Sequence, residues 1–153
     1  MSIIGIISDT HGRINDEALD ALAGVDFIIH AGDIGSLDVL MELEATAPTI
    51  AVLGNNDHNV DYGPGVNESA TQVIDGVRMF ISHYPKDAER AAASGEYDLV
   101  IHGHTHVPRD EVRDGCRIIN PGSAFRPRCG SGRRIALVEL EGGRVGSVQS
   151  VTV

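Results

Sequence analysis

The sequence contains no tryptophan, and aromatic residues make up only 4% of its 153 residues. A buried core must therefore consist mainly of Ile, Val, Leu and Ala, and a hydrophobic fraction of 42% indicates a folded chain rather than a disordered one. No apolar run approaches the roughly 20 residues that a membrane span requires, so we expect no contact with a membrane. The length suits one domain, and we expect residues 1–153 to form it.

Cysteine is also scarce. Cys116 and Cys129 are the only two, and their spacing is not that of a metal site. No basic residue precedes the apolar stretch near the N-terminus, as it would in a secretory signal peptide. We therefore expect reduced thiols and a cytoplasmic protein.

Basic residues are outnumbered, 12 against 22 acidic ones, which gives a formal net charge of −10. Binding of long nucleic acids depends on basic patches and on aromatic side chains that stack on bases, and both are scarce here. A solvated acidic surface accounts for most of this negative charge. Bound divalent cations would offset part of it.

The first third of the chain alternates apolar, β-branched runs with helical patterns. We expect strands at residues 3–7, 27–29 and 49–53, with helices at 16–22 and 37–44, the second capped by Ser36. This order predicts parallel strands with helices packed on them.

The remainder of the chain is richer in strands. Hairpins with Asp-Gly or Gly-Gly turns are expected at residues 71–82, 111–119 and 134–151. We also expect a helix at 88–94, a buried strand at 99–101 and a long loop from Asn56 to Ala70. Hairpins beside a parallel core predict an α/β fold with two packed sheets and helices outside.

Residues able to bind metal follow five of the expected strands. They are Asp9, His11, Asp33, Asn55, His83, His104 and His106. Ligands of open α/β sheets bind outside the carboxyl ends of the strands, so these residues should meet at one edge. Carboxylate, imidazole and amide groups suit Mn²⁺, Fe or Zn²⁺. Two such ions share a bridging carboxylate, clamp a phosphate and activate a bound water.

Several other polar residues have ordinary structural explanations. Asp33 after Gly32 could simply lie in a turn. We expect His30 to be a packed, hydrogen-bonded core histidine, and His102 to support the structure rather than bind metal. A further set of arginines could contact phosphate or could equally be surface residues: Arg13, Arg126 and Arg128.

Six segments of the sequence resemble the motifs of a known family. They are Ser8–Gly12, His30–Asp33, Gly54–Asp57, Ser82–His83, Gly103–His106 and Asn120–Ser123, the last followed by Pro127 and Arg128. Together they are similar to the calcineurin-like metallophosphoesterases, and most to their small, single-domain bacterial and archaeal phosphodiesterases. The motifs extend from residue 8 to residue 128, so the resemblance covers nearly the whole chain.

The resemblance implies a four-layer α/β/β/α sandwich of mixed sheets and a site with two divalent transition-metal ions. We expect Mn²⁺, with Fe, Zn²⁺ or Ni²⁺ as alternatives. The first metal would be held by Asp9, His11 and His106, the second by Asn55, His83 and His104, and Asp33 would bridge them. The implied reaction is hydrolysis of a small phosphodiester, or of a phosphomonoester, and the implied partner is a small phosphorylated substrate.

Two positions depart from the family pattern. Many members have a histidine where this chain has Asn56, whose amide can donate a hydrogen bond but cannot transfer a proton at neutral pH. We expect Asn56 and Asp33 to take part in catalysis. His58 could replace the missing histidine only from a displaced position. Tyr84 follows His83 where the family has glycine, and it should bring bulk close to the site.

Two alternative functions remain open from the sequence. One is a non-catalytic, protein-binding scaffold of the same fold, which degraded ligand positions would favour. The other is a cyclic-nucleotide phosphodiesterase or a nuclease. The sequence also leaves open whether the chain forms a homo-oligomer.

Overall fold

The computed structural model describes all residues from 1 to 153. In chain order its elements are β1 (Ser2–Ile7), α1 (Asp16–Leu22), β2 (Phe27–His30), α2 (Leu37–Thr46), β3 (Thr49–Ala51), β4 (Ser69–Ile74), β5 (Val77–Ser82), α3 (Pro85–Ala93), β6 (Leu99–Ile101), β7 (Arg109–Arg113), β8 (Cys116–Asn120), β9 (Arg134–Glu141) and β10 (Arg144–Thr152). They form two five-stranded sheets with the orders β10-β9-β1-β2-β3 and β4-β5-β6-β8-β7.

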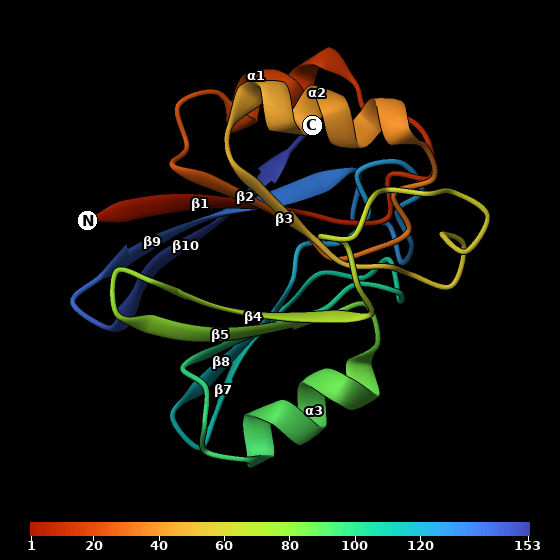
Figure 1. The fold of residues 1–153 in the computed structure, drawn as a ribbon. Helices are drawn as coiled ribbons and strands as arrows, with labels where there is room; N and C mark the ends of the chain where they lie inside the picture. The colour runs from red at the N-terminus through yellow and green to blue at the C-terminus, as the bar shows by residue number, and fades with distance from the viewer.

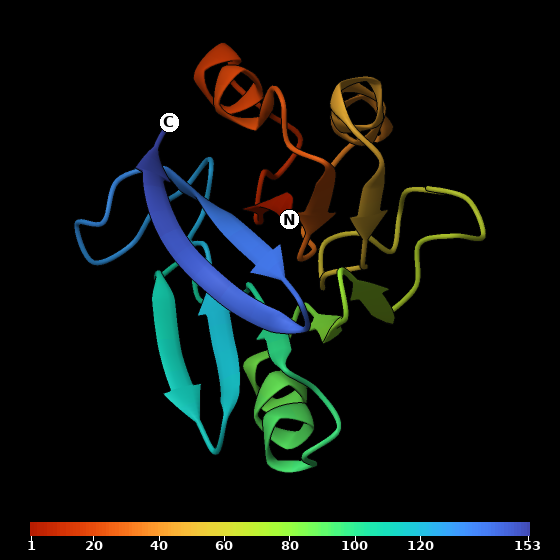
Figure 2. The same ribbon diagram turned by 90° about the vertical axis from the view of Figure 1, so that its left-hand side faces the viewer.

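The elements stack in four layers, as expected for an α/β/β/α sandwich. Helices α1 and α2 cover the outer face of the first sheet, α3 covers the outer face of the second, and the two sheets face each other (Figure 1). The perpendicular view shows the same order, with the long β9–β10 hairpin extending the first sheet away from its parallel strands (Figure 2). No helix has the length and hydrophobicity needed to span a membrane.

Both sheets are mixed. Strands β1, β2 and β3 are parallel, as the alternating pattern predicts, and β9 joins β1 in the antiparallel direction. In the second sheet, β5, β6 and β8 are parallel, with β4 and β7 antiparallel at the two edges. The carboxyl ends of the three parallel strands of each sheet therefore lie at one edge of that sheet.

Side chains of β1 alternate between two apolar layers. Ile4 and Ile6 are fully buried between the sheets, whereas Ile7 packs among residues of α1 and α2. Gly5 faces α1, where a Cβ would lie 2.3 Å from Cδ2 of Leu22, so glycine permits the close approach of helix and strand. The buried hydrophobic core contains no aromatic residue, as the composition predicts.

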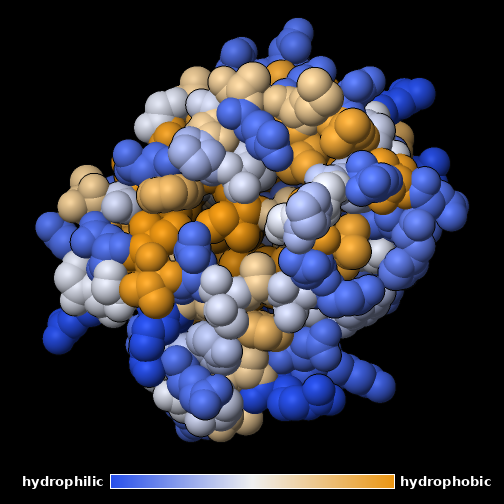
Figure 3. Space-filling view, viewed as in Figure 1, coloured by the Kyte–Doolittle hydropathy of each residue, from blue (hydrophilic) through white to orange (hydrophobic).

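The hydrophobic core between the two sheets is not fully covered at its edges. Half-buried residues such as Ile50 on β3 and Ala70 on β4 pack against it. Hydrophobic side chains reach the surface at the level of the two sheets, where they lie among hydrophilic ones (Figure 3). β3 and β4 are edge strands, so no further strand covers this part of the core.

Several element boundaries differ from the sequence-based expectation, among them those of α3 and β3. Helix α3 begins at Pro85, three residues before the expected start, because proline lacks the N–H that the first helical position leaves unpaired. Strand β3 ends at Ala51 rather than at residue 53. Beyond it, Val52 forms only an isolated bridge to Asn67, and the loop that follows extends to the start of β4 at Ser69.

Candidate metal centre

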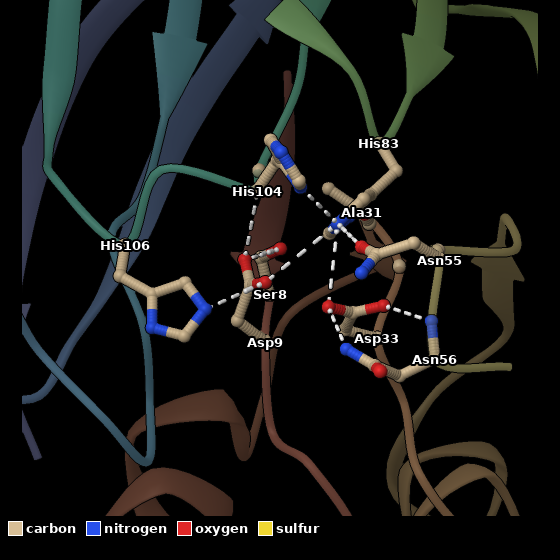
Figure 4. A network of polar contacts seen from close by, with 12 residues as sticks. Ser8, Asp9, Ala31, Asp33, Asn55, Asn56, His83, His104 and His106 are labelled. Carbon is tan, nitrogen blue, oxygen red and sulfur yellow. Dashed lines mark hydrogen bonds and ion pairs between the residues drawn. The ribbon is translucent and has the colours of Figure 1, made fainter.

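The seven expected ligands lie together where the carboxyl ends of β1, β2, β3, β5 and β6 meet. Figure 4 labels all of them except His11. One group surrounds the Asp9 carboxylate. Its Oδ1 lies 3.2 Å from Nε2 of His106 and 3.8 Å from Nε2 of His11, and those two nitrogens are 3.3 Å apart. These three residues form a cluster that could hold one metal ion.

A second group surrounds the imidazole of His83. Its Nε2 lies 3.1 Å from Oδ1 of Asn55 and 3.2 Å from Nδ1 of His104. Asp9 Oδ1 is 3.9 Å from the same nitrogen, so the two groups are in contact. Asp9, His11 and Asn55 follow strands of the first sheet, whereas His83, His104 and His106 follow strands of the second. The centre therefore lies on the seam between the sheets.

Asp33 lies between the two groups. Its Oδ2 is 3.7 Å from Nε2 of His11 and 3.4 Å from Nε2 of His83. Asn56 donates to both of its oxygens, from the backbone N–H to Oδ1 at 2.9 Å and from Nδ2 to Oδ2 at 3.0 Å. A Cβ on Gly54 would lie 2.1 Å from Asp33 Oδ1, so a larger residue there would displace the carboxylate.

The backbone at the site is unusual. Eight non-glycine residues have positive φ angles, and five of these are expected ligands: Asp9, His11, Asp33, His104 and His106. Left-handed backbone is unfavourable for L-residues by roughly 1–3 kcal/mol, and such residues cluster at functional sites. Asp and His adopt it more readily than most residues. The chain therefore turns sharply after these strands, so that two side chains of one motif can both face the centre.

Backbone carbonyl groups orient two of the imidazoles. His83 donates from Nδ1 to the carbonyl of Ala31 at 2.8 Å, and His106 donates from Nδ1 to the carbonyl of Arg126 at 2.6 Å. With the Nδ1 protons held there, the neutral rings present the Nε2 lone pairs to the centre. This arrangement is typical of metal-binding histidines.

The close packing of carboxyl and imidazole groups at the site shifts their pKa values. Burial raises the pKa of the Asp33 carboxyl, but His83 and the N–H groups of Asn56 more than offset it, so the pKa lies below its usual range. For Asp9, burial is likewise outweighed by His106 and His83, and the pKa is lowered. The pKa of His106 is raised by Asp9, and that of His83 is raised by Asp33 against the effect of its burial. Metal binding would have to displace protons from these rings.

His30 and His102 are not among the clustered ligands, as the sequence favoured. The His30 ring is buried between Oγ1 of Thr10 at 3.0 Å and the backbone N–H of Gly32 at 3.1 Å. His102 lies against the carbonyl of Gly103 and the guanidinium of Arg109. Both rings support the chain next to the ligands.

Asp57 and Ser123 hold the ligand loops together, a role that the sequence did not reveal. Asp57 is fully buried and accepts hydrogen bonds from Tyr62 and from three backbone N–H groups, those of Ile34, Gly35 and Gly54. Ser123 donates to the carbonyl oxygen of Asp9 at 2.8 Å. The only signal for either was its place within a family motif.

An open cavity of about 880 Å³ lies over the centre. Arg126 and Arg128 line it together with five of the expected ligands and Asn56, whereas Arg13 lines a neighbouring cavity. His58 is exposed and does not line the cavity. Tyr84 packs against the rings of His83 and His104, with centroids 5.2 and 5.5 Å apart, so it brings the expected bulk close to the site.

Comparison with known proteins identifies the family. The model of the calcineurin-like phosphoesterase superfamily domain matches residues 1–143. The chain belongs to this superfamily. A probable metallophosphoesterase of Methanothermobacter thermautotrophicus is 37% identical over 138 residues, which cover 82% of this chain and 79% of that protein.

Solved structures show the same calcineurin-like phosphoesterase fold. A solved archaeal phosphodiesterase superposes with a TM-score of 0.82 at 30% identity, over 99% of both chains. The vacuolar protein sorting 29 protein of Cryptosporidium parvum superposes with a TM-score of 0.80 at 17% identity, over 99% of this chain and 98% of that one. The second likeness concerns the fold alone. The relatives are named metallophosphoesterase and phosphodiesterase, and this chain has two groups of residues that could hold a metal ion.

Proposed function

We propose that the protein is a phosphodiesterase that uses two divalent transition-metal ions, with Mn²⁺ as the preferred ion. One observation carries the proposal. Oδ1 of Asp9 is the only buried side-chain nitrogen or oxygen without a hydrogen-bond partner, although three imidazole nitrogens lie within 3.9 Å of it. Leaving such an acceptor unpaired costs about 1–3 kcal/mol, and more when it is charged. A cation coordinated by the same imidazoles would satisfy it.

The donor set fits two ions. Asp9, His11 and His106 would hold the first, and His83, Asn55 and His104 would hold the second. Asp33 would bridge them, which its position between His11 and His83 supports. Nitrogen donors make Mn²⁺, Fe, Zn²⁺ or Ni²⁺ better suited than Ca²⁺, which prefers all-oxygen sites. When bound, two such cations would stabilise charge on a phosphate and supply the nucleophile for hydrolysis.

The side chains around the centre have separate roles in this proposal. Asn56 holds the Asp33 carboxylate with its backbone and side-chain N–H groups. Arg126 and Arg128 line the cavity and form no ion pair with any carboxylate of the chain, so they are free to bind phosphate oxygens. Guanidinium groups suit this task because they offer paired N–H donors.

No residue of the cavity is placed to protonate a leaving group. Every histidine that lines it is a proposed ligand, and the remaining residues do not exchange protons near neutral pH. A positioned general acid contributes roughly 10²–10⁴-fold to a rate. The protein should therefore act best on esters whose leaving groups depart as stable anions. Phosphodiesters with activated groups are preferred over alkyl phosphomonoesters.

Metal analysis and kinetics test the proposal together. We expect about two metal ions per chain by plasma mass spectrometry, and hydrolysis of bis(p-nitrophenyl) phosphate that a chelator abolishes and Mn²⁺ restores. Full activity after exhaustive chelation would overturn the metal requirement. A protein that binds no metal and hydrolyses no ester would support the scaffold alternative instead. A cytoplasmic location, and the assignment of residues 1–153 to one domain, remain predictions.

A further inference from the structure

A second cavity lies beside the metal centre. It has a volume of about 600 Å³, and Gly12, Arg13 and Phe125 are among its lining residues. Their chain neighbours His11 and Arg126 line the cavity over the centre. Residues 11–13 and 125–126 therefore form a ridge between the two cavities. Ligand pockets for small molecules have volumes of roughly 300–1,000 Å³, so the second cavity is large enough for an organic group.

The ridge is attached to the proposed metal ligands. Ser123 accepts hydrogen bonds from the N–H groups of Phe125 and Arg126, at 3.1 and 2.8 Å, and donates to the carbonyl of Asp9. The carbonyl of Arg126 in turn accepts the Nδ1 proton of His106. The second cavity thus has a fixed position relative to the centre.

The two cavities differ in charge. The one over the centre adds Arg126 and Arg128 to the proposed ligands. In the second cavity, two cations are balanced by two carboxylates: Arg13 and Arg133 against Asp38 and Glu42. None of these four side chains forms an ion pair or side-chain hydrogen bond, whereas five other arginines pair with carboxylates. The second cavity therefore suits a neutral group with hydrogen-bond donors better than a second phosphate.

The remaining lining of the second cavity is apolar. Ile14, Val39, Ala124 and Phe125 provide it, and the Phe125 ring lies 5.7 and 5.4 Å from the guanidinium carbons of Arg13 and Arg126. A planar group can stack on a guanidinium or an aromatic ring while its polar edge reaches the carboxylates. This combination suits a heteroaromatic ring that carries hydroxyl or amino groups.

We propose that the second cavity is a specificity subsite for a neutral organic group of nucleoside size in a phosphodiester whose phosphate lies over the metal centre. The subsite rests on the proposed function, because only a substrate held at the centre places its ester group there. The subsite predicts that the rate of hydrolysis depends on the ester group that stays attached to the phosphate after the leaving group departs. Substrates with the same leaving group should then react at different rates.

Two nitrophenyl esters test this directly. Thymidine 5′-(p-nitrophenyl phosphate) and methyl p-nitrophenyl phosphate share their leaving group and differ in the retained group. We expect the Mn²⁺-loaded enzyme to favour the thymidine ester in kcat/KM by at least about tenfold, the lower end of what one apolar contact contributes to selectivity. Glu42→Trp should fill the cavity from the exposed face of α2 and reduce this ratio to about one. Glu44→Trp, exposed on the same helix but outside the cavity, should leave the ratio unchanged.

A binding measurement separates the subsite from the reaction. Thymidine added to the Zn²⁺-loaded protein should shift the amide resonances of Gly12, Val39 and Phe125, and Glu42→Trp should abolish these shifts. Such shifts without hydrolysis of either ester would show that the cavity binds a nucleoside, but would refute the proposed function and, with it, the assignment of the cavity as a specificity subsite. Hydrolysis of both esters with equal kcat/KM, or a ratio that Glu42→Trp leaves intact, would overturn the subsite alone. Absence of both shifts and hydrolysis would overturn both proposals.

Discussion

Mild acid should destabilise the metal-free protein through His30. This ring is fully buried, and burial lowers its pKa from 6.5 to about 4. The unfolded chain binds a proton there below about pH 6.5, whereas the folded protein binds none until about pH 4. The unfolded state therefore holds more protons in this window. The free energy of unfolding falls as the pH drops through it, and His30 has no effect on the pH dependence above it.

The size of the effect follows from the pKa difference. The interval from 6.5 to about 4 corresponds to about 3 kcal/mol, at about 1.4 kcal/mol per pKa unit. About 2 kcal/mol of this is lost by pH 5. Domains are stable by only about 5–15 kcal/mol, so the loss is easily measured. It also concerns the site, because the added proton goes to Nδ1 and breaks the hydrogen bond that this nitrogen accepts from the N–H of Gly32, the residue before the proposed ligand Asp33.

Urea unfolding in the presence of a chelator measures this loss for the wild type, His30→Gln and His58→Gln. We expect His30→Gln to be less stable at about pH 7.5, because its amide cannot fully replace the bonds to Thr10 and Gly32. Between pH 6.5 and 5, however, it should lose about 2 kcal/mol less than the wild type. His58 is exposed, so its variant should follow the wild type at every pH. Parallel curves for the wild type and His30→Gln would refute the reasoning.

Three further predictions concern the centre. Asp33→Ala should abolish turnover and lower metal content more than His11→Ala, because a bridging carboxylate serves both ions; an equal or milder effect in kinetics and metal analysis would count against the bridge. Asn56→His should raise turnover of alkyl esters more than that of a nitrophenyl ester, since only the former need a proton donor; uniform change at unchanged metal content would show that position 56 does not govern leaving-group choice. Gly54→Ala should reduce kcat by at least about tenfold, because its Cβ would displace Asp33, whereas Gly65→Ala, with nothing within 4 Å, should be neutral when both are assayed in parallel.

The fold was largely predictable because its elements carry local signals. Apolar, β-branched runs marked β1, β2 and β6, and Ser36 marked the start of α2, where its side chain accepts a hydrogen bond from the N–H of Val39. The start of α3 was missed because the apolar pattern begins at Ala88, although Pro85 was the better signal. β3 was predicted too long because Val52 continues the apolar run while its partner there is a loop residue.

It was also predictable that the proposed ligands would lie together, because each residue follows a strand whose direction is fixed by the α/β pattern. The residues that hold the proposed ligands in place could not be predicted in this way. Asp57 acts on backbone groups 22 and 23 residues away, and Ser123 acts on Asp9 from 114 residues away. Such contacts leave no periodic trace in a sequence. Nor does any pattern show that Asn56 would use its amide to hold Asp33.

The pairing of β1 with β9 sets an order on biosynthesis. All seven proposed ligands are translated by residue 106, well before β9, which begins at Arg134 and pairs with β1 from Ser2 to Ile6. A nascent chain therefore carries every metal-binding side chain before the sheet that aims four of them can be completed. Long-range strand pairing of this kind is slow, and here it cannot begin before β9 has been synthesised. Completion of the first sheet therefore has to follow synthesis of the last proposed ligand.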